Sequence, residues 1–204
     1  MFQTNTIQAD TKILDIMPVI GFGTWEITGK SCIESVKDAI HMGYRHIDTA
    51  QMYTNEKEVG KGIRQSGIER EELFVTTKIA TNNLKPDLIR KTAIESLTRL
   101  NMDYVDLLLI HWPTPDMDLR ACLETMFELK EQKRIKHVGV SNFDPELFEQ
   151  AIEIGPVINN QVKFTPHHTQ MDNLAVARKH NKIITAYSPL ERGSIVKDST
   201  LEEI

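Results

Sequence analysis

Residues 105–111 read Val-Asp-Leu-Leu-Leu-Ile-His, and the four residues from Leu107 to Ile110 are all apolar. A strand with one face in water alternates apolar and polar side chains, whereas a strand covered on both faces reads as a continuous apolar run. Parallel sheets are covered on both faces because crossover helices pack against them. This stretch therefore predicts a strand of a parallel sheet and disfavours an antiparallel meander.

Six further short apolar runs flank this one, and stretches with helical spacing of apolar residues separate them. In one such stretch Ile89, Ala93 and Leu97 fall on a single helix face. The alternation predicts an α/β fold in one domain over residues 1–204. A small hairpin with its turn at residues 8–11 is expected before the first strand. The expected strands are 19–22, 45–47, 73–77, 105–110, 137–140, 157–162 and 183–186.

Glycine usage distinguishes the two arrangements that a repeating strand–helix order allows, a doubly wound sheet and a closed barrel. A doubly wound dinucleotide-binding sheet carries G-x-G-x-x-G after its first strand, but here Gly21 and Gly23 are followed by Glu26. The chain also lacks the G-x-x-x-x-G-K-[ST] motif of phosphate-binding loops. The sequence therefore favours a (β/α) barrel.

Composition and charge exclude several classes of protein. The 204 residues contain 40% hydrophobic and 26% charged side chains, which is typical of a folded globular protein. A net charge of −5 provides no basic surface for a nucleic acid. The N-terminus lacks the features of a signal peptide, and no apolar run approaches the ~20 residues that span a bilayer. We therefore expect a cytoplasmic protein without a nucleic-acid or membrane partner.

The cysteine and histidine pattern predicts neither a disulfide nor a metal site. Cys32 and Cys122 are far apart and match no redox or metal-binding spacing, which indicates a reducing compartment. His167 and His168 are adjacent, but no third ligand accompanies them at a matching spacing, so we interpret them as a loop pair.

Polar side chains follow most of the predicted strands at the point where each strand ends. In a (β/α) barrel the carboxyl ends of the strands meet at one mouth, where active sites lie. Six strand ends would therefore bring polar groups together. These groups are Asp48, Lys78, His111, Ser141 with Asn142, Gln161, and Tyr187 with Ser188.

Taken singly, each of these side chains also has a structural explanation. Asp48 could cap a turn, Lys78 could end a strand in solvent, and His111 could be a hydrogen-bonded structural histidine. The others could cap a helix, form a core amide or pack as a core aromatic. The functional interpretation rests on their shared position in the topology.

The chemistry of these residue types points to protonation of a reduced carbonyl. Tyr53 follows Asp48 closely, and its ordinary pKa of ~10 makes it a poor acid at neutral pH. A lysine ammonium beside the phenol, such as Lys78, stabilises the phenolate and lowers that pKa, while Asp48 can hold the lysine. A histidine such as His111 can orient a carbonyl oxygen. The cluster supplies no nucleophile or metal, so hydride must come from a cofactor.

At these positions the sequence strongly resembles the aldo-keto reductases, from about Lys12 to the last residue. Several long motifs occur in the order found in that family. They are Gly-Phe-Gly-Thr-Trp at 21–25, Gly-Tyr-Arg-His-Ile-Asp-Thr-Ala-Gln-Met-Tyr at 43–53, Thr-Thr-Lys at 76–78, Leu-Leu-Leu-Ile-His-Trp-Pro at 107–113, Gly-Val-Ser-Asn-Phe at 139–143, Asn-Gln-Val at 160–162 and Ala-Tyr-Ser-Pro-Leu at 186–190.

The resemblance implies a (β/α)8 TIM barrel that transfers hydride from NADPH, or from NADH, to a small-molecule aldehyde or ketone. The short loops are most similar to those of diketogluconate and methylglyoxal reductases. By motif matching, Tyr53 is the general acid, Lys78 and Asp48 tune it, and His111 orients the carbonyl. The resemblance places Trp25 and Trp112 on the substrate side with Tyr53 and His111. It assigns cofactor binding to Gly23, Thr24, Asp48, Ser141, Asn142, Gln161, Tyr187, Ser188 and Leu190.

The sequence departs from the family pattern at its C-terminus. The eighth strand with Ile-Pro-Lys-Ser, and the following helix with an arginine for the cofactor 2′-phosphate, are both absent. Ser199 and Glu202 form a capping box that predicts the start of a helix, and only two residues follow. We therefore expect a barrel that lacks its final helix–strand–helix portion, with unpaired edges on the first and seventh strands.

Two alternatives to a carbonyl reductase follow from this pattern. One is a regulatory relative that binds the nucleotide and uses its occupancy as a signal. The other is an inactive truncated fragment, in which the missing elements weaken cofactor binding. The intact tetrad of Asp48, Tyr53, Lys78 and His111 favours the enzyme over the regulatory relative.

Overall fold

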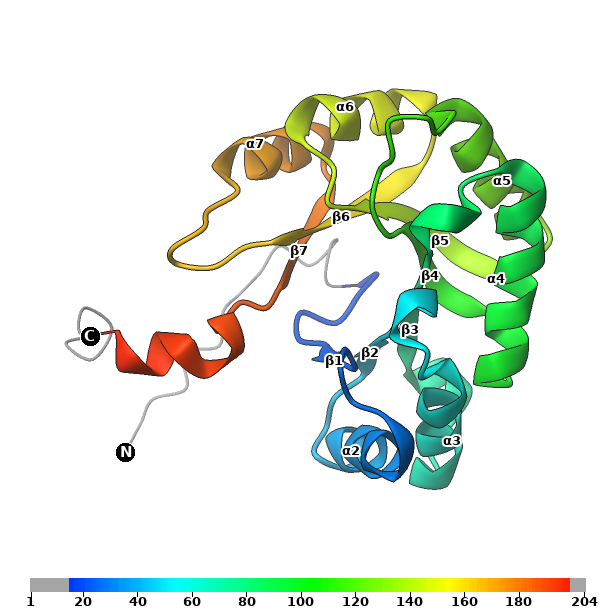
Figure 1. The fold of residues 1–204 in the computed structure, drawn as a ribbon, viewed down its shortest axis with the longest axis vertical. Coiled ribbons are helices and arrows are strands. Elements are labelled where there is room, and N and C mark those ends of the chain that lie inside the picture. The colour runs from blue at the N-terminus through cyan, green and yellow to red at the C-terminus, as the bar shows by residue number, and fades with distance from the viewer. Residues whose placement is uncertain (1–14, 199–204) are drawn as a thin grey trace.

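Seven parallel strands form one sheet whose order in space follows the chain, β1-β2-β3-β4-β5-β6-β7. The computed structural model describes residues 15–198 (Figure 1). The expected hairpin and the expected helix start at Ser199 lie outside the described residues. The strands are β1 (Phe22–Gly23), β2 (His46–Asp48), β3 (Phe74–Ile79), β4 (Val105–Ile110), β5 (Ile135–Ser141), β6 (Val157–Lys163) and β7 (Ile183–Tyr187).

Helices connect successive strands and lie along the outside of the curved sheet (Figure 1). Each crossover returns the chain to the same end of the sheet, so all neighbouring strands are parallel. Within residues 15–198, no helix is both long and apolar enough to cross a lipid bilayer. The helices are α2 (Gly29–His41), α3 (Glu56–Ser66), α4 (Pro86–Leu100), α5 (Leu119–Glu131), α6 (Pro145–Ile154) and α7 (Met171–His180), with short 3₁₀ helices η1 (Gln51–Tyr53), η2 (Arg70–Glu72), η3 (Thr81–Asn83) and η4 (Glu191–Lys197).

The central strands confirm the prediction from the apolar run. β4 begins and ends where the sequence predicted, and every residue of β3 and β4 is buried. The side chains of β4 pack in two separate clusters, because successive residues of a strand point to opposite faces of the sheet. Leu108 and Ile110 belong to the main core with the helices, whereas Leu107 and Leu109 form a second cluster with Phe74.

The first strand is shorter than predicted. Residues 19–22 were expected to be extended, but β1 comprises only Phe22 and Gly23, and Val19 and Ile20 are exposed. β1 pairs with β2 alone, at Phe22 with Ile47 and Gly23 with Asp48, and β2 itself spans only three residues, which leaves few positions for pairing. A strand with one partner forms half the ladder hydrogen bonds of an internal strand.

Within residues 15–198, β1 and β7 do not pair with each other, so the sheet is an almost closed barrel with two free edges. This arrangement agrees with the expectation of seven strands and unpaired outer edges. The chain after β7 continues through η4, which lies beside the open side of the barrel (Figure 1). Residues of β7 and of the segment before β1 line the same cavity as the polar strand ends.

One glycine shows how closely the outer helices approach each other. A Cβ atom on Gly60 of α3 would lie 2.0 Å from the carbonyl oxygen of Leu100, the last residue of α4. No side chain can move aside to relieve this contact, because the obstacle is backbone. Only glycine therefore permits this approach of α3 to α4.

We predict that Gly60→Ala lowers the free energy of unfolding by about 2 kcal/mol or more, because the overpacked helices must shift. Chemical denaturation followed by circular dichroism measures the change. Lys57→Ala is the matched control, since Lys57 is exposed on the same helix and its loss should change stability by about 0.5 kcal/mol or less. A Gly60→Ala protein as stable as the control variant would contradict the close contact.

Candidate active site

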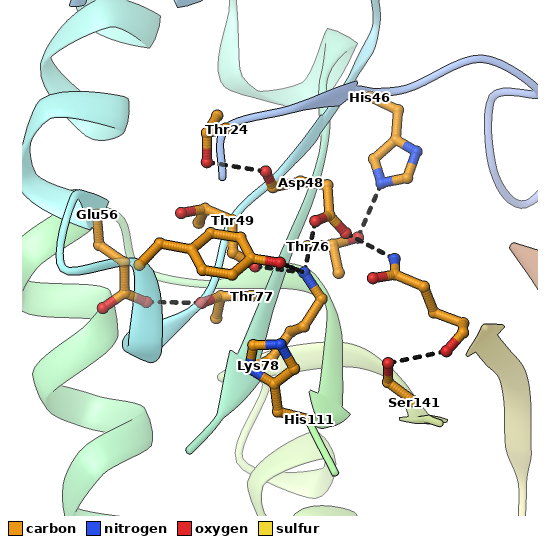
Figure 2. A network of polar contacts seen from close by, with 12 residues as sticks. Thr24, His46, Asp48, Thr49, Glu56, Thr76, Thr77, Lys78, His111 and Ser141 are labelled. Carbon is orange, nitrogen blue, oxygen red and sulfur yellow. Dashed lines mark hydrogen bonds and ion pairs between the residues drawn. The ribbon is translucent and has the colours of Figure 1, made fainter. Parts of the chain in front are cut away.

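A fully buried lysine lies at the centre of the site. Lys78 comes from the carboxyl end of β3 and has no exposed surface. Its ammonium donates to Asp48 Oδ1 at 2.5 Å, to the Thr49 carbonyl at 2.9 Å and to the Tyr53 hydroxyl at 3.2 Å. Figure 2 shows these contacts meeting at the Lys78 nitrogen. All three donors of the ammonium are satisfied.

The neighbours of Lys78 keep it charged. Burial alone would lower the pKa of the Lys78 ammonium, but the negative charge of Asp48 and the contacts with Asp48 and Tyr53 hold it above its ordinary value. Asp48 ends β2, next to β3 in the sheet, and the register places Asp48 opposite Thr76. The ion pair is therefore a direct consequence of strand pairing.

Asp48 also connects the two sides of the barrel. Its Oδ2 accepts a hydrogen bond from Gln161 Nε2 at 2.8 Å, across 113 residues of sequence. Its backbone carbonyl accepts from the amide and the hydroxyl of Thr24, both at 3.0 Å. These contacts fix the carboxylate that holds Lys78.

Tyr53 reaches the lysine from η1, the short 3₁₀ helix that follows β2. Its ring makes an edge-to-face contact with the His111 ring, with centroids 5.6 Å apart. Lys78 lowers the pKa of the Tyr53 phenol, as the sequence predicted, but the net direction of the pKa shift is the opposite. Burial raises the pKa of the Tyr53 phenol and outweighs the lowering by Lys78, so the net pKa lies above 10.

His111 follows β4 and is neutral. Burial and the Lys78 charge together lower the pKa of the His111 imidazole to about 4, against a usual value of 6.5. Its Nδ1 is buried and has no hydrogen-bond partner among the described residues. A neutral imidazole has one donor and one acceptor nitrogen, so His111 can donate to a carbonyl oxygen without carrying a charge.

A second group of polar side chains comes from β5, β6 and β7. Ser141 donates to the Gln161 carbonyl at 2.8 Å, and Asn142 donates to Ser141 and to the His111 carbonyl, both at 3.0 Å. The Tyr187 hydroxyl donates to Asn142 Oδ1 at 2.9 Å. Among the described residues, nothing donates to Gln161 Oε1. This group therefore presents an amide acceptor beside the tetrad.

These side chains surround a cavity of about 960 Å³. Trp25 and Trp112, the two tryptophans of the chain, both line it and are each nearly half exposed. Gly23 and Ser188 line it as well. The cavity continues to the free edges of β1 and β7, where residues 17–21 and 183–187 form its walls.

Two residues expected to bind a cofactor do not line this cavity. Thr24 is fully buried, and its hydroxyl is used by the Asp48 carbonyl, so it braces Asp48. Leu190 lies just after β7 and is two-thirds exposed.

His167 is an exposed loop residue that lies between Glu191 and Asp198. Residues 15–198 contain no cluster of side chains arranged to hold a metal ion.

Sequence reasoning missed the residues that support the tetrad. Asn55 donates to the carbonyls of Thr24 and Ile27 and accepts from Thr49, which ties the loop after β1 to the loop after β2. Asn55 directly precedes α3, but its side chain makes no capping hydrogen bond to that helix. His46 is buried and hydrogen bonds to Thr76 at 2.9 Å (Figure 2). In the sequence, only its position two residues before Asp48 indicated that His46 lies near the site.

Comparison with known proteins decides the family. The sequence profile of the Aldo/keto reductase family matches residues 19–204. The chain belongs to the aldo/keto reductase family. It is 39% identical over 193 residues to methylglyoxal reductase DkgB of Escherichia coli O157:H7, covering 92% of this chain and 72% of the relative. It is 40% identical to the 9,11-endoperoxide prostaglandin H2 reductase of Trypanosoma cruzi, covering 92% and 68%.

Solved structures agree with this assignment. A putative 2,5-diketo-D-gluconic acid reductase B superposes with a TM-score of 0.90 at 36% identity, covering 92% of this chain and 68% of that one. An aldo/keto reductase from Brucella melitensis superposes with a TM-score of 0.87 at 39% identity, covering 92% and 72%. This aldo/keto reductase therefore has the TIM-barrel fold of its relatives. Family members are oxidoreductases that act on carbonyl groups with a nicotinamide cofactor.

We predict that the low pKa of His111 makes the protein less stable as the pH falls from about 6.5 to about 4. In this range the unfolded chain takes up a proton on this imidazole more readily than the folded protein does. The contribution of His111 to the free energy of unfolding is therefore fully present above pH 6.5 and is lost progressively below it. Melting temperatures measured across this range should fall more steeply for the wild type than for His111→Gln.

Burial also lowers the pKa of His46 and of His137, so the comparison uses the difference between the two proteins. Burial lowers the pKa of His46 too, and His46→Gln serves as the second variant. Identical pH profiles for the wild type and His111→Gln would contradict the low pKa.

Proposed function

We propose that this aldo/keto reductase reduces small aldehydes and ketones, with Tyr53 as the general acid. The observation that carries the proposal is the contact of the Tyr53 hydroxyl with the buried Lys78 ammonium at 3.2 Å, beside the neutral ring of His111. A proton donor needs stabilisation of its conjugate base, and Lys78 is placed to stabilise the phenolate. The cavity gives a small molecule access to these groups.

The reaction follows from these positions. A nicotinamide cofactor bound beside these residues would provide the hydride that reduces the carbonyl carbon. The carbonyl oxygen accepts hydrogen bonds from Tyr53 and His111, and Tyr53 transfers its proton to that oxygen as negative charge develops there. The products are the alcohol and the oxidised nicotinamide. Burial keeps the Tyr53 phenol protonated before the reaction, and Lys78 lowers the free energy of the phenolate that forms.

The residues around the tetrad fit a nicotinamide cofactor. A carboxamide needs an acceptor and a donor, and Gln161 Oε1 and the Ser141–Asn142 pair are both at the cavity wall. Tyr187 lines the same wall and offers an aromatic face. We propose that these four residues bind the nicotinamide, and that the cofactor is NADPH, as is usual in the family.

The remaining roles are proposals of the same kind. Trp25 and Trp112 give the substrate an apolar surface. Methylglyoxal is the substrate named for the DkgB relatives and is our first candidate. Cys32 and Cys122 are free and buried, which suits a reducing compartment such as the cytoplasm.

We predict that Tyr53→Phe lowers kcat for methylglyoxal by about 10²–10⁴-fold, because the general acid is removed. NADPH oxidation followed by absorbance measures the rate. Nucleotide affinity, measured by quenching of the two cavity tryptophans, should change little. Tyr44→Phe is the matched control, since Tyr44 packs against Phe22 and makes no hydrogen bond through its hydroxyl among the described residues.

The same measurements separate the alternatives. A wild-type protein that binds NADPH but reduces no member of an aldehyde and ketone panel would be a regulatory relative. A wild-type protein that neither binds NADPH nor reduces a carbonyl would be an inactive fragment. Equal activity of the Tyr53→Phe and Tyr44→Phe proteins would exclude Tyr53 as the acid.

A further inference from the structure

The segment that carries Tyr53 is short. η1 comprises only Gln51, Met52 and Tyr53, and no side chain caps its first turn. The hydrogen-bond geometry of a 3₁₀ helix is poorer than that of an α-helix, so three such residues do not fix their own position. Met52 is half exposed and forms no side-chain hydrogen bond with the described residues. The position of Tyr53 must therefore come from contacts of η1 with neighbouring segments.

The side chain of Gln51 supplies such contacts. Its Oε1 accepts hydrogen bonds from the Ala80 amide at 2.9 Å and from Asn83 Nδ2 at 3.1 Å. Its Nε2 donates to the Ser96 hydroxyl at 3.1 Å. Ala80 directly follows β3, Asn83 belongs to η3 and Ser96 belongs to α4. One side chain thus joins the first residue of η1 to three other parts of the fold.

The bond between Gln51 and Ala80 lies close to the contact between Tyr53 and Lys78. Gln51 is two residues before Tyr53, and Ala80 is two residues after Lys78. Ala80 is buried, so its amide would lose its hydrogen-bond acceptor without gaining water if Gln51 moved away. The hydrogen bond therefore holds η1 against the end of the strand that carries the lysine.

A second attachment lies on the other side of Tyr53. Glu56 is the first residue of α3 and is buried, and its Oε1 accepts from the Thr77 hydroxyl at 2.6 Å (Figure 2). Thr77 directly precedes Lys78 on β3. The other carboxylate oxygen accepts from Arg99 Nε at 2.7 Å. The chain is thus tied to β3 both before and after Tyr53.

Helix α4 connects these two attachments. The Ser96 hydroxyl accepts a hydrogen bond from Gln51 and another from Arg99 Nη2, both at 3.1 Å. Arg99 in turn binds Glu56. Hydrogen bonds therefore lead without interruption from Gln51 through α4 to Glu56, and Tyr53 lies between the two ends of this path.

We propose that Gln51 is a positioning residue that holds Tyr53 within reach of Lys78. Gln51 does not line the cavity, so it acts through η1 and not through contact with a substrate. The inference rests on the proposed role of Tyr53 as the general acid and adds the side chain that places this acid. A general acid must lie within hydrogen-bond reach of the atom that it protonates, so a small displacement slows the reaction.

The first experiment tests the position of Tyr53 without turnover. Its ring is in edge-to-face contact with the His111 ring, so the wild type should give a nuclear Overhauser cross-peak between their ring protons. Gln51→Met keeps the length of the side chain and removes the amide, and this cross-peak should weaken or disappear. Gln65→Met is the matched control, since Gln65 is exposed on α3 and the cross-peak should remain.

The second experiment measures turnover. Gln51→Met should lower kcat for methylglyoxal about tenfold and leave KM nearly unchanged. The solvent deuterium isotope effect on kcat should increase, because a misplaced acid makes proton transfer the slow step. A smaller fraction of folded protein would lower kcat without changing the isotope effect. Gln51→Glu keeps an acceptor for the Ala80 amide and should retain more activity than Gln51→Met.

Circular dichroism checks that each variant is folded. If Gln51→Met does not fold, Gln51→Asn replaces it, because the shorter side chain keeps an amide but falls one methylene short of Ala80. In a folded variant, an unchanged cross-peak or an unchanged isotope effect would overturn the proposal. A wild type that reduces no carbonyl would instead contradict the proposed function, and the cross-peak would still decide whether Gln51 positions Tyr53.

Discussion

The rest of the site depends on the burial of one ammonium group. Lys78 has no exposed surface, and an unpaired charge at such a position would cost several kcal/mol. The structure satisfies it with a carboxylate from β2, a backbone carbonyl and a phenol. These partners can meet only if β2 and β3 keep their register and η1 folds back over them. The requirement to solvate Lys78 therefore positions both Asp48 and Tyr53.

The same constraint extends through further hydrogen bonds. Gln161 of β6 donates to the Asp48 carboxylate, and the Thr24 hydroxyl donates to the Asp48 backbone carbonyl. Asn55 in turn links Thr24 to Thr49. Thr24, Thr49 and Asn55, which do not line the cavity, thus help to determine where the reacting groups lie. Supporting contacts of this kind keep an active site in its working geometry, because each side chain has few alternative positions.

Local patterns predicted where most strands lie and which polar side chains follow them. The run 105–110 became β4 with the same ends, and the polar residues after successive strands came together at one mouth. The prediction was wrong at residues 19–22, where a strand with one partner extends over two residues only. The role of Asn55 was missed, because the carbonyls of Thr24 and Ile27 to which it donates lie 31 and 28 residues away in sequence, and periodicity does not reveal such contacts.

Periodicity and residue type in the chain alone determined the α/β class, the parallel sheet and the identity of the polar strand ends, because the alternation of strands and helices is a local property. The tertiary structure decided their electrostatic state. Burial makes His111 neutral, and it raises the pKa of Tyr53 by more than the charge of Lys78 lowers it. The fold also brings Arg192 over the ring of Trp25, although the two residues are far apart in the sequence. Desolvation and such distant contacts depend on the packed molecule, so no stretch of sequence contains them.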